Sequence, residues 1–255
     1  MALADDGVEL DALTLEALAP YDQFHGRGLE ATAELADTLD VSPDDLLLDV
    51  GSGLGGPARY MADRFGCRVV GVDLTGELCD VAGRLTALTG LTGRVSNAHA
   101  SALAMPFRDA VFDGAYSMNV TMNIADRAAL YAEMGRLLRP GGWLVVSEIA
   151  RGPNPGLAYP TPWARGESES FLLPPAETVG LLEAAGFIVT GVVDTSAAAL
   201  DSAARARELV QAGQKPPHRA IAIVHGEIGA EAAANSGRGL REGQVIPIEV
   251  HCRRP

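Results

Sequence analysis

The segment Leu46–Gly56 constrains the fold more than any other part of the chain. Its apolar run ends in Asp49, and glycines then follow at alternate positions, Gly51, Gly53 and Gly55. A short continuous apolar run is typical of a parallel strand that is buried on both faces. Glycines directly after such a strand allow a tight turn in which bare backbone approaches a ligand closely. The segment therefore predicts a strand, a turn and a helix, with a nucleotide-type ligand across the tip of the strand.

Two kinds of ligand fit this turn. Gly51, Gly53 and Gly56 match the G-x-G-x-x-G spacing of a dinucleotide site, and Asp73 ends a second apolar run about twenty residues later, where a ribose-binding acid is expected. Asp73 does not discriminate, because any adenosine ribose needs such an acceptor. Asp49 does discriminate between the two ligands. Its carboxylate would repel a pyrophosphate, whereas it would attract a ligand that carries an ammonium and a sulfonium. A turn without any ligand is the third interpretation, and it leaves the entropic cost of clustered glycines unexplained.

Composition narrows the choice of partners. The formal net charge of −13 argues against nucleic acid and anionic membranes, both of which bind basic surfaces. No basic and apolar leader is visible, and no apolar run reaches the roughly 20 residues that cross a bilayer. The three cysteines are widely spaced and predict neither a disulfide framework nor a metal site. We therefore expect a cytoplasmic protein with a small-molecule partner and no metal, and the sequence leaves its oligomeric state open.

Apolar, strand-like segments alternate with helical patterns along most of the chain. The expected strands are 46–50, 67–73, 93–99, 111–118, 143–149, 187–194 and 244–252, and the expected helices are 10–18, 28–39, 56–65, 76–88, 126–138, 176–185, 201–212 and 217–235, the first two being separated by a break at 19–22. This alternation predicts an α/β fold with a parallel sheet and right-handed crossovers. Residues 152–175 contain six prolines and form the longest irregular stretch, which marks a functional loop.

Four motifs together resemble one family. Asp49–Gly55, Asp73, Pro106–Asp113 and Leu137–Val145 are similar, in order and spacing, to the motif set of class I S-adenosylmethionine (SAM) dependent methyltransferases, over about residues 20–195. The resemblance implies a Rossmann-like seven-stranded sheet in the order 3-2-1-4-5-7-6, with strand 7 antiparallel and helices on both faces. It also implies a helical lid over residues 1–40, a methyltransferase domain over 41–255, and a substrate-side loop at 152–175.

Two shorter segments are similar to small-molecule methyltransferases, namely the sarcosine/dimethylglycine N-methyltransferases and the ubiquinone-type C-methyltransferases. Tyr21–Gly26 resembles their amino-terminal lid. Tyr159–Ala164, followed by Ser170–Leu172, resembles the loop after strand 5 in the dimethylglycine-type enzymes.

By this resemblance SAM is the cofactor and S-adenosylhomocysteine its product. Gly51, Gly53 and Gly55 would face the methionine part and Asp73 the ribose hydroxyls, with Leu74 against the adenine. Ser101 and Ala102 occupy the adenine-binding position, where Ser101 replaces the usual Asp, and Met118 and Asn119 would lie near the sulfonium. With Asp49, these residues form the predicted cofactor site.

The acceptor side is predicted from aromatic residues and one histidine. Rings bind apolar bodies and stabilise cations, so the expected substrate residues are Tyr21, Phe24, Met122, Tyr159, Trp163 and Phe171. His25, in the lid, is the candidate general base, and its alternative role is to anchor the lid.

We therefore expect methyl transfer to a small molecule, with N-methylation of a dimethylglycine-like amine favoured. O- or C-methylation of a secondary metabolite or quinone-like acceptor is the first alternative. A dinucleotide-dependent dehydrogenase and a non-catalytic SAM-binding protein are the alternatives from other classes.

Overall fold

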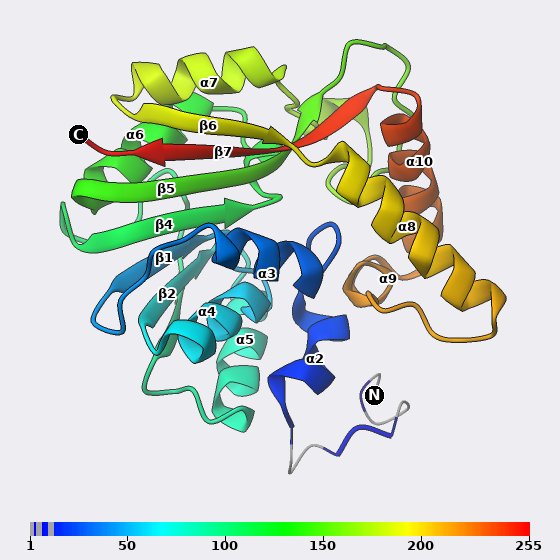
Figure 1. The fold of residues 1–255 in the computed structure, drawn as a ribbon, viewed down its shortest axis with the longest axis horizontal. Coiled ribbons are helices and arrows are strands. Elements are labelled where there is room, and N and C mark those ends of the chain that lie inside the picture. The colour runs from blue at the N-terminus through cyan, green and yellow to red at the C-terminus, as the bar shows by residue number, and fades with distance from the viewer. Residues whose placement is uncertain (1–2, 4–6, 10–12) are drawn as a thin grey trace.

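A twisted seven-stranded sheet lies at the centre of the protein (Figure 1). The computed structural model describes residues 3, 7–9 and 13–255. The strands are β1 Leu46–Val50, β2 Arg68–Asp73, β3 Val95–His99, β4 Phe112–Met118, β5 Leu138–Arg151, β6 Ile188–Asp194 and β7 Val245–Arg253. Their order is β3-β2-β1-β4-β5-β7-β6, and β7 runs antiparallel to both of its neighbours. The predicted sheet order and the antiparallel strand 7 are confirmed.

Helices cover both faces of this sheet, as expected. Consecutive residues of a strand point to opposite faces. Leu47 accordingly packs with α3 (Leu29–Asp37) and α4 (Gly56–Phe65), whereas Leu48 packs with α6 (Arg127–Leu137) and α7 (Pro175–Ala184) on the other side. The fifth helix of the core, α5 (Gly76–Leu88), packs along β2 and β3.

Two predicted helix boundaries are wrong. The break expected at 19–22 does not occur: α2 (Leu15–Asp22) begins at a Thr14 cap and continues through Pro20, ending two residues later. Residues 10–12 of the expected first helix lie outside the described residues. The single helix expected at 217–235 is two helices, α9 (Ala220–His225) and α10 (Gly229–Arg241), because the chain turns at Gly226 with a positive φ of 57°.

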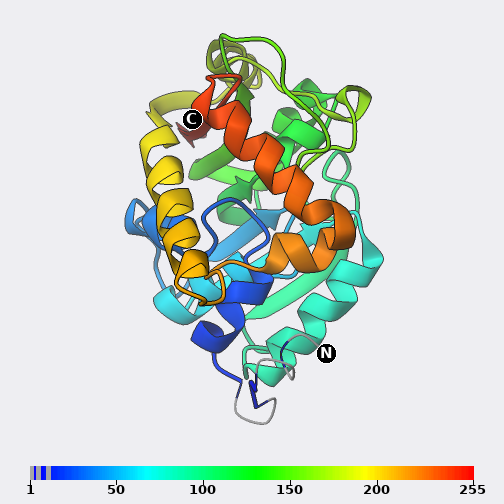
Figure 2. The same ribbon diagram turned by 90° about the vertical axis from the view of Figure 1, so that its right-hand side faces the viewer.

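A second lid segment, which the sequence did not predict, comes from the connection between β6 and β7. This connection forms α8 (Ser196–Gln211), α9 and α10, which stand beyond the carboxyl ends of the parallel strands (Figure 1). In Figure 2, α9 lies against α2. The N–H of Arg219 donates to the carbonyl of Pro20 at 2.7 Å. These two segments, the predicted amino-terminal lid and the β6–β7 connection, are far apart in sequence and contact each other, and we call them the lid segments.

One buried guanidinium joins the lid to the sheet. Arg59, on α4, is fully buried, and its Nη2 donates to Asp22 Oδ2 at 2.7 Å and to the carbonyl of Leu54 at 2.6 Å. Its Nη1 donates to the carbonyl of Ala82 and the hydroxyl of Thr86, both at 3.2 Å on α5. Burial raises the pKa of Asp22 to about 6 even though the neighbouring guanidinium opposes the shift. Desolvation thus outweighs the attraction, and the pair acts mainly by fixing geometry.

The close approach of the lid also depends on Gly56. A Cβ on Gly56 would lie 2.6 Å from the carbonyl oxygen of Asp22, so a side chain at this position would push the lid away. The glycine that completes the apparent dinucleotide spacing therefore allows the lid to pack closely.

Among the described residues, no helix has the length and apolarity needed to cross a membrane.

Replacement of Arg59 should cost much more stability than replacement of its neighbour on the same helix. We expect Arg59→Met to lower the free energy of unfolding by about 3–5 kcal/mol, because Asp22 is left as an unpaired buried carboxyl. Arg64→Met, which removes an exposed pair with Asp37, should cost less than about 1 kcal/mol. Urea denaturation of both variants measures this, and equal losses would contradict the role of Arg59.

Candidate functional site

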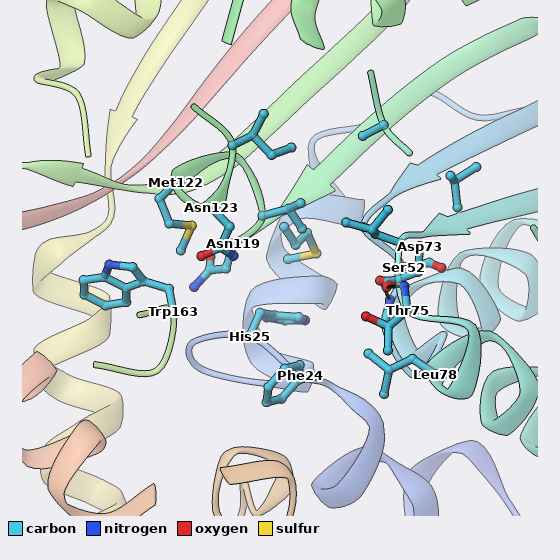
Figure 3. A pocket seen from close by; sticks show the side chains of 18 of the residues that line it. Phe24, His25, Ser52, Asp73, Thr75, Leu78, Asn119, Met122, Asn123 and Trp163 are labelled. Atoms are coloured by element: carbon cyan, nitrogen blue, oxygen red, sulfur yellow. Dashed lines mark hydrogen bonds between the residues drawn. The ribbon is translucent and has the colours of Figure 1, made fainter. Parts of the chain in front are cut away.

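A cavity of about 640 Å³ opens at the carboxyl ends of β1, β2 and β4, under the two lid segments. Figure 3 shows its two sides. Asp73, Ser52, Thr75 and Leu78 lie on one side, Trp163, Met122, Asn119 and Asn123 lie on the other, and His25 and Phe24 reach in from the lid. Parallel sheets place their ligands at this edge, where the strand order reverses on either side of β1.

Gly51 and Gly53 shape the turn at the centre of the cavity. Gly51 has a φ of 77°, and a Cβ there would lie 2.3 Å from Val120 Cγ2. Gly53 has a φ of 51°, and a Cβ there would meet nothing within 4 Å. Gly51 therefore allows close packing of the turn against the segment after β4, while Gly53 leaves bare backbone facing the cavity.

Gly55 does not line the cavity, contrary to the prediction. A Cβ on Gly55 would point at Arg59 Nη1, 2.9 Å away, and at Ala82 on α5. Its φ of 75° serves the left-handed turn that starts α4. The alternation of glycines does not place all three on one side, because the turn winds into a helix after Gly53.

The carboxylate of Asp73 is held at the wall by backbone donors. The N–H of Gly53 donates to Oδ2 at 2.8 Å and the N–H of Thr75 donates to Oδ1 at 2.9 Å. Each oxygen retains acceptor capacity, so the group presents two fixed acceptor sites to a ligand.

An apolar slot lies beside Asp73. Leu74, 72% exposed, lines it with Ala102 and Leu103. The hydroxyl oxygen of Ser101 accepts from the N–H of Leu103 at 3.2 Å, which leaves its proton free for a ligand. A flat heterocycle next to the carboxylate of Asp73 would fit this slot.

Asp49 is a buried carboxyl that lines the cavity and forms no ion pair with the described residues. It is 2% exposed and its Oδ2 makes no hydrogen bond within the described part of the chain. Burial raises the pKa of Asp49 to about 8; the Tyr116 hydroxyl nearby, outside hydrogen-bond geometry, opposes this shift, and the charge of Asp73 adds to it. A cationic ligand group would restore the charged form, as the sequence argument expected.

His25 lines the cavity, but both of its ring nitrogens contact protein atoms. Nδ1 donates to the carbonyl of Gly26 at 3.1 Å, while Nε2 lies 3.0 Å from Thr32 Oγ1 and 3.3 Å from Gln23 Oε1. Burial lowers the pKa of His25 to about 4, although the contact with the Gly26 carbonyl opposes this. The imidazole is therefore neutral near pH 7 and ties the lid loop to α3.

The aromatic side is fixed by the loop after β5. Trp163 Nε1 donates to the hydroxyl of Ser170 at 2.9 Å, and the N–H of Phe171 donates to the carbonyl of Met122 at 2.9 Å. Phe24, from the lid, faces them across the cavity.

Tyr21 and Tyr159 were predicted on this side and lie outside the lining. The Tyr21 ring packs under the guanidinium of Arg219, 5.2 Å from its centroid, on the α9 side of the lid. Tyr159 precedes Pro160, whose carbonyl accepts from Asn235 on α10, so this part of the loop packs on the β6–β7 connection.

A buried ion pair lies beneath the aromatic side. Arg127 Nη1 donates to Glu148 Oε2 at 2.6 Å, and Thr178 donates to Glu148 Oε1 at 2.6 Å. Arg127 Nη2 donates to the carbonyl of Phe171 at 3.1 Å. The end of β5 and the start of α6 thus hold the backbone of Phe171 beside the cavity.

Two lining residues of consequence were missed from the sequence. Asn123 follows β4 by five residues, and its place after a strand tip was a usable signal. Ile221 comes from α9, and nothing local in the sequence connects that helix to the cavity.

Among the described residues, no three His, Cys, Asp or Glu side chains gather to hold a metal ion.

The fold and this cavity define the class I methyltransferase architecture, and the comparisons agree. Residues 48–146 match the family described as a methyltransferase domain. The resemblance of the motifs to class I SAM-dependent methyltransferases is confirmed. The alternative interpretation, a dinucleotide-dependent dehydrogenase, is not supported by these comparisons.

Two curated relatives show how far the sequence match extends. Phosphoethanolamine N-methyltransferase 3 of Arabidopsis thaliana is 36% identical over 127 residues, which is 50% of this chain and 26% of that protein. The 24-methylenesterol C-methyltransferase 2 of Oryza sativa subsp. japonica is 38% identical over 127 residues, 48% of this chain and 35% of that protein. The matched region thus spans about a quarter to a third of these relatives.

Solved structures match over most of the chain. The [4+2]-cyclase SpnF has a TM-score of 0.70 at 24% identity, covering 89% of this chain and 80% of that one. A geranyl diphosphate methyltransferase in complex with SAM has a TM-score of 0.71 at 22% identity, covering 89% and 85%. At these identities the likeness establishes the fold.

The unpaired carboxyl of Asp49 should make stability depend on pH. In the unfolded chain it ionises near its ordinary pKa of 3.8, whereas in the folded protein it keeps its proton up to about pH 8. Folding then takes up a proton across this window, so its contribution to stability is complete below pH 4 and is lost as the pH rises toward 8.

Asp49→Asn should remove this dependence. We expect the difference in unfolding free energy, variant minus wild type, to grow by more than about 1.4 kcal/mol between pH 4 and pH 8, which is the equivalent of one pKa unit. Urea titrations of both proteins at the two pH values measure it. A difference that stays constant with pH would show that Asp49 is ionised in the folded protein.

Proposed function

We propose that the protein is a SAM-dependent methyltransferase that acts on a small molecule and releases S-adenosylhomocysteine. The observation that carries this is the buried carboxyl of Asp49, whose Oδ2 makes no hydrogen bond within the described residues, beside the bare backbone of Gly53 and the fixed carboxylate of Asp73. These groups fit the three polar parts of SAM. Asp49 would face its ammonium and sulfonium, Gly53 its methionine portion, and Asp73 its ribose hydroxyls.

The remaining lining residues suit the rest of the cofactor. Leu74 and Ala102 would hold the adenine, and the free proton of the Ser101 hydroxyl would replace the usual carboxylate contact there. Met118 and Asn119, at the tip of β4, lie between this half and the aromatic side. When bound, SAM supplies a methyl group on a positively charged sulfur, so the acceptor needs only a lone pair in line with the S–C bond.

Within this function we propose N-methylation of an amine. Its support is that neither His25 nor Glu148 is free to act as a base. His25 is held by protein contacts at both nitrogens, and Glu148 is bound by Arg127 and Thr178. An amine needs only to be neutral when it attacks, whereas a phenol or an activated carbon needs a proton removed. His25 then acts as the lid anchor.

The chain's own residues would mainly position the acceptor and exclude water. The two lid segments, joined where His218 Nε2 donates to the carbonyl of Gln23 at 2.6 Å, cover the cavity. The backbone carbonyl of Phe171 is held by Arg127. Such positioning supplies a large share of the rate in a transfer that needs alignment.

Asp73 gives the first test. Asp73→Ala should weaken SAM binding at least about tenfold in calorimetry, because the ribose hydroxyls lose a charged acceptor. The exposed Asp80→Ala on α5 is the control and should keep wild-type affinity. Circular dichroism verifies that both variants fold. Normal SAM affinity in folded Asp73→Ala would refute the assignment.

Gly53 gives a second test with a matched control. Gly53 and Gly90 both have positive φ, 51° and 72°, and a Cβ on either meets nothing within 4 Å. Replacement by Ala should therefore cost each about 1–2 kcal/mol of stability. Only Gly53→Ala places a methyl group in the cavity, so only this variant should lose SAM affinity. Equal affinities in the two variants would place the cofactor elsewhere.

A further inference from the structure

The acceptor half of the cavity carries no positive charge. None of the described residues that line it is Lys or Arg, and its one imidazole, His25, is neutral near pH 7. The ionisable side chains that remain are the carboxyls of Asp49, Asp73 and Asp126. A carboxylate or phosphate in this space would meet no compensating cation, and burying such a group unpaired is costly.

The arginines behind the cavity walls do not change this. Arg59 is paired with Asp22 and Arg127 with Glu148, each pair being buried. Neither guanidinium lines the cavity. Their charges are balanced before any substrate arrives, and their hydrogen bonds hold the lid and Phe171.

The amino terminus of α6, the helix that starts at the acceptor side, is already capped by a protein side chain. Helix N-termini attract anions through their free N–H groups and dipole. At the start of α6, however, Asp126 lines the cavity and its Oδ1 accepts from the N–H of Ala129 at 2.9 Å. An acidic side chain already fills the position that an anionic substrate would use.

The groups that do face this half are apolar rings and amides. Phe24, Trp163 and Phe171 contribute rings and Met122 a thioether. The carboxamides of Asn119 and Asn123 face the cavity, and neither makes a hydrogen bond in the part of the chain that the structure describes (Figure 3). Such walls suit a hydrophobic body with one polar or positively charged centre.

Resting on the proposed function, we infer that the acceptor is a lipophilic amine without a carboxylate or phosphate group. The aromatic rings hold its apolar body and stabilise its ammonium form, at roughly 0.5–2 kcal/mol for each ring. The free carboxamides bind its polar substituents. The net charge of −13 steers cations toward the cavity and repels anions.

This acceptor differs from the zwitterionic dimethylglycine expected from the short loop match. It also differs from the phosphorylated or diphosphorylated compounds in the names of two similar proteins. The difference follows from this chain's own lining, since dimethylglycine and both phosphorylated compounds carry an anionic group and no described lining residue supplies a cation to pair with it.

Binding of three matched probes tests the inference without knowledge of the natural substrate. The full chain, saturated with S-adenosylhomocysteine, is titrated calorimetrically with benzyltrimethylammonium, phenylacetamide and phenylacetate. We expect the cation and the amide to bind and phenylacetate to bind at least tenfold more weakly than the cation. Phenylacetate binding as tightly as the cation, or no binding of any probe, would overturn the inference.

A charge placed at the rim should change this preference. Asn123→Arg should reduce the ratio of cation to anion affinity at least tenfold, whereas Gln211→Arg, which adds the same charge on the exposed face of α8 outside the cavity, should leave it unchanged. An unchanged ratio in Asn123→Arg would also overturn the inference.

The first titration, with S-adenosylhomocysteine alone, separates the two proposals. Absence of this binding refutes the methyltransferase assignment itself. Binding of S-adenosylhomocysteine together with a preference for phenylacetate refutes only the acceptor class.

Discussion

The buried guanidinium of Arg59 determines how the lid, the glycine turn and α5 stand relative to one another. Its donors reach Asp22 on α2, the carbonyl of Leu54 in the turn, and Ala82 and Thr86 on α5. Because the group cannot lose its charge, every one of these partners is fixed once it is buried. Arg59 therefore fixes both the position of Gly53 beside Asp73 and the position of the lid loop above them.

Buried charge is used in two ways in this molecule. Arg59 with Asp22 and Arg127 with Glu148 are paired, and they fix the two sides of the cavity. Asp49 is unpaired and costs stability in the absence of a ligand. A site that is complete only when its ligand is bound has to keep such a group, which is why stability and binding are opposed at this position.

The sequence predicted the central sheet well because its information is local. Strands β1, β2 and β5 contain apolar runs. The turn at Gly51 and Gly53 and the acid at Asp73 lie where adjacent strands end. The errors arose where distant segments meet. Gly55 turned away because α4 begins there, and Tyr21 packed on Arg219, whose place next to the lid depends on the whole β6–β7 connection. Whether His25 had a free nitrogen likewise depended on Thr32, one helix further along.

The same fold is shared by solved structures named as a cyclase, a C-methyltransferase and an N-methyltransferase, so the architecture does not select the reaction. Selection has to come from the half of the cavity that the motifs do not describe. In this chain that half is formed by the loop after β5, the tip of β4 and the two lid segments, none of which contributes a cation within the described lining. Under the proposed function the motif half would be the same whatever the acceptor, so the carboxamides and rings opposite it would decide which molecule is methylated.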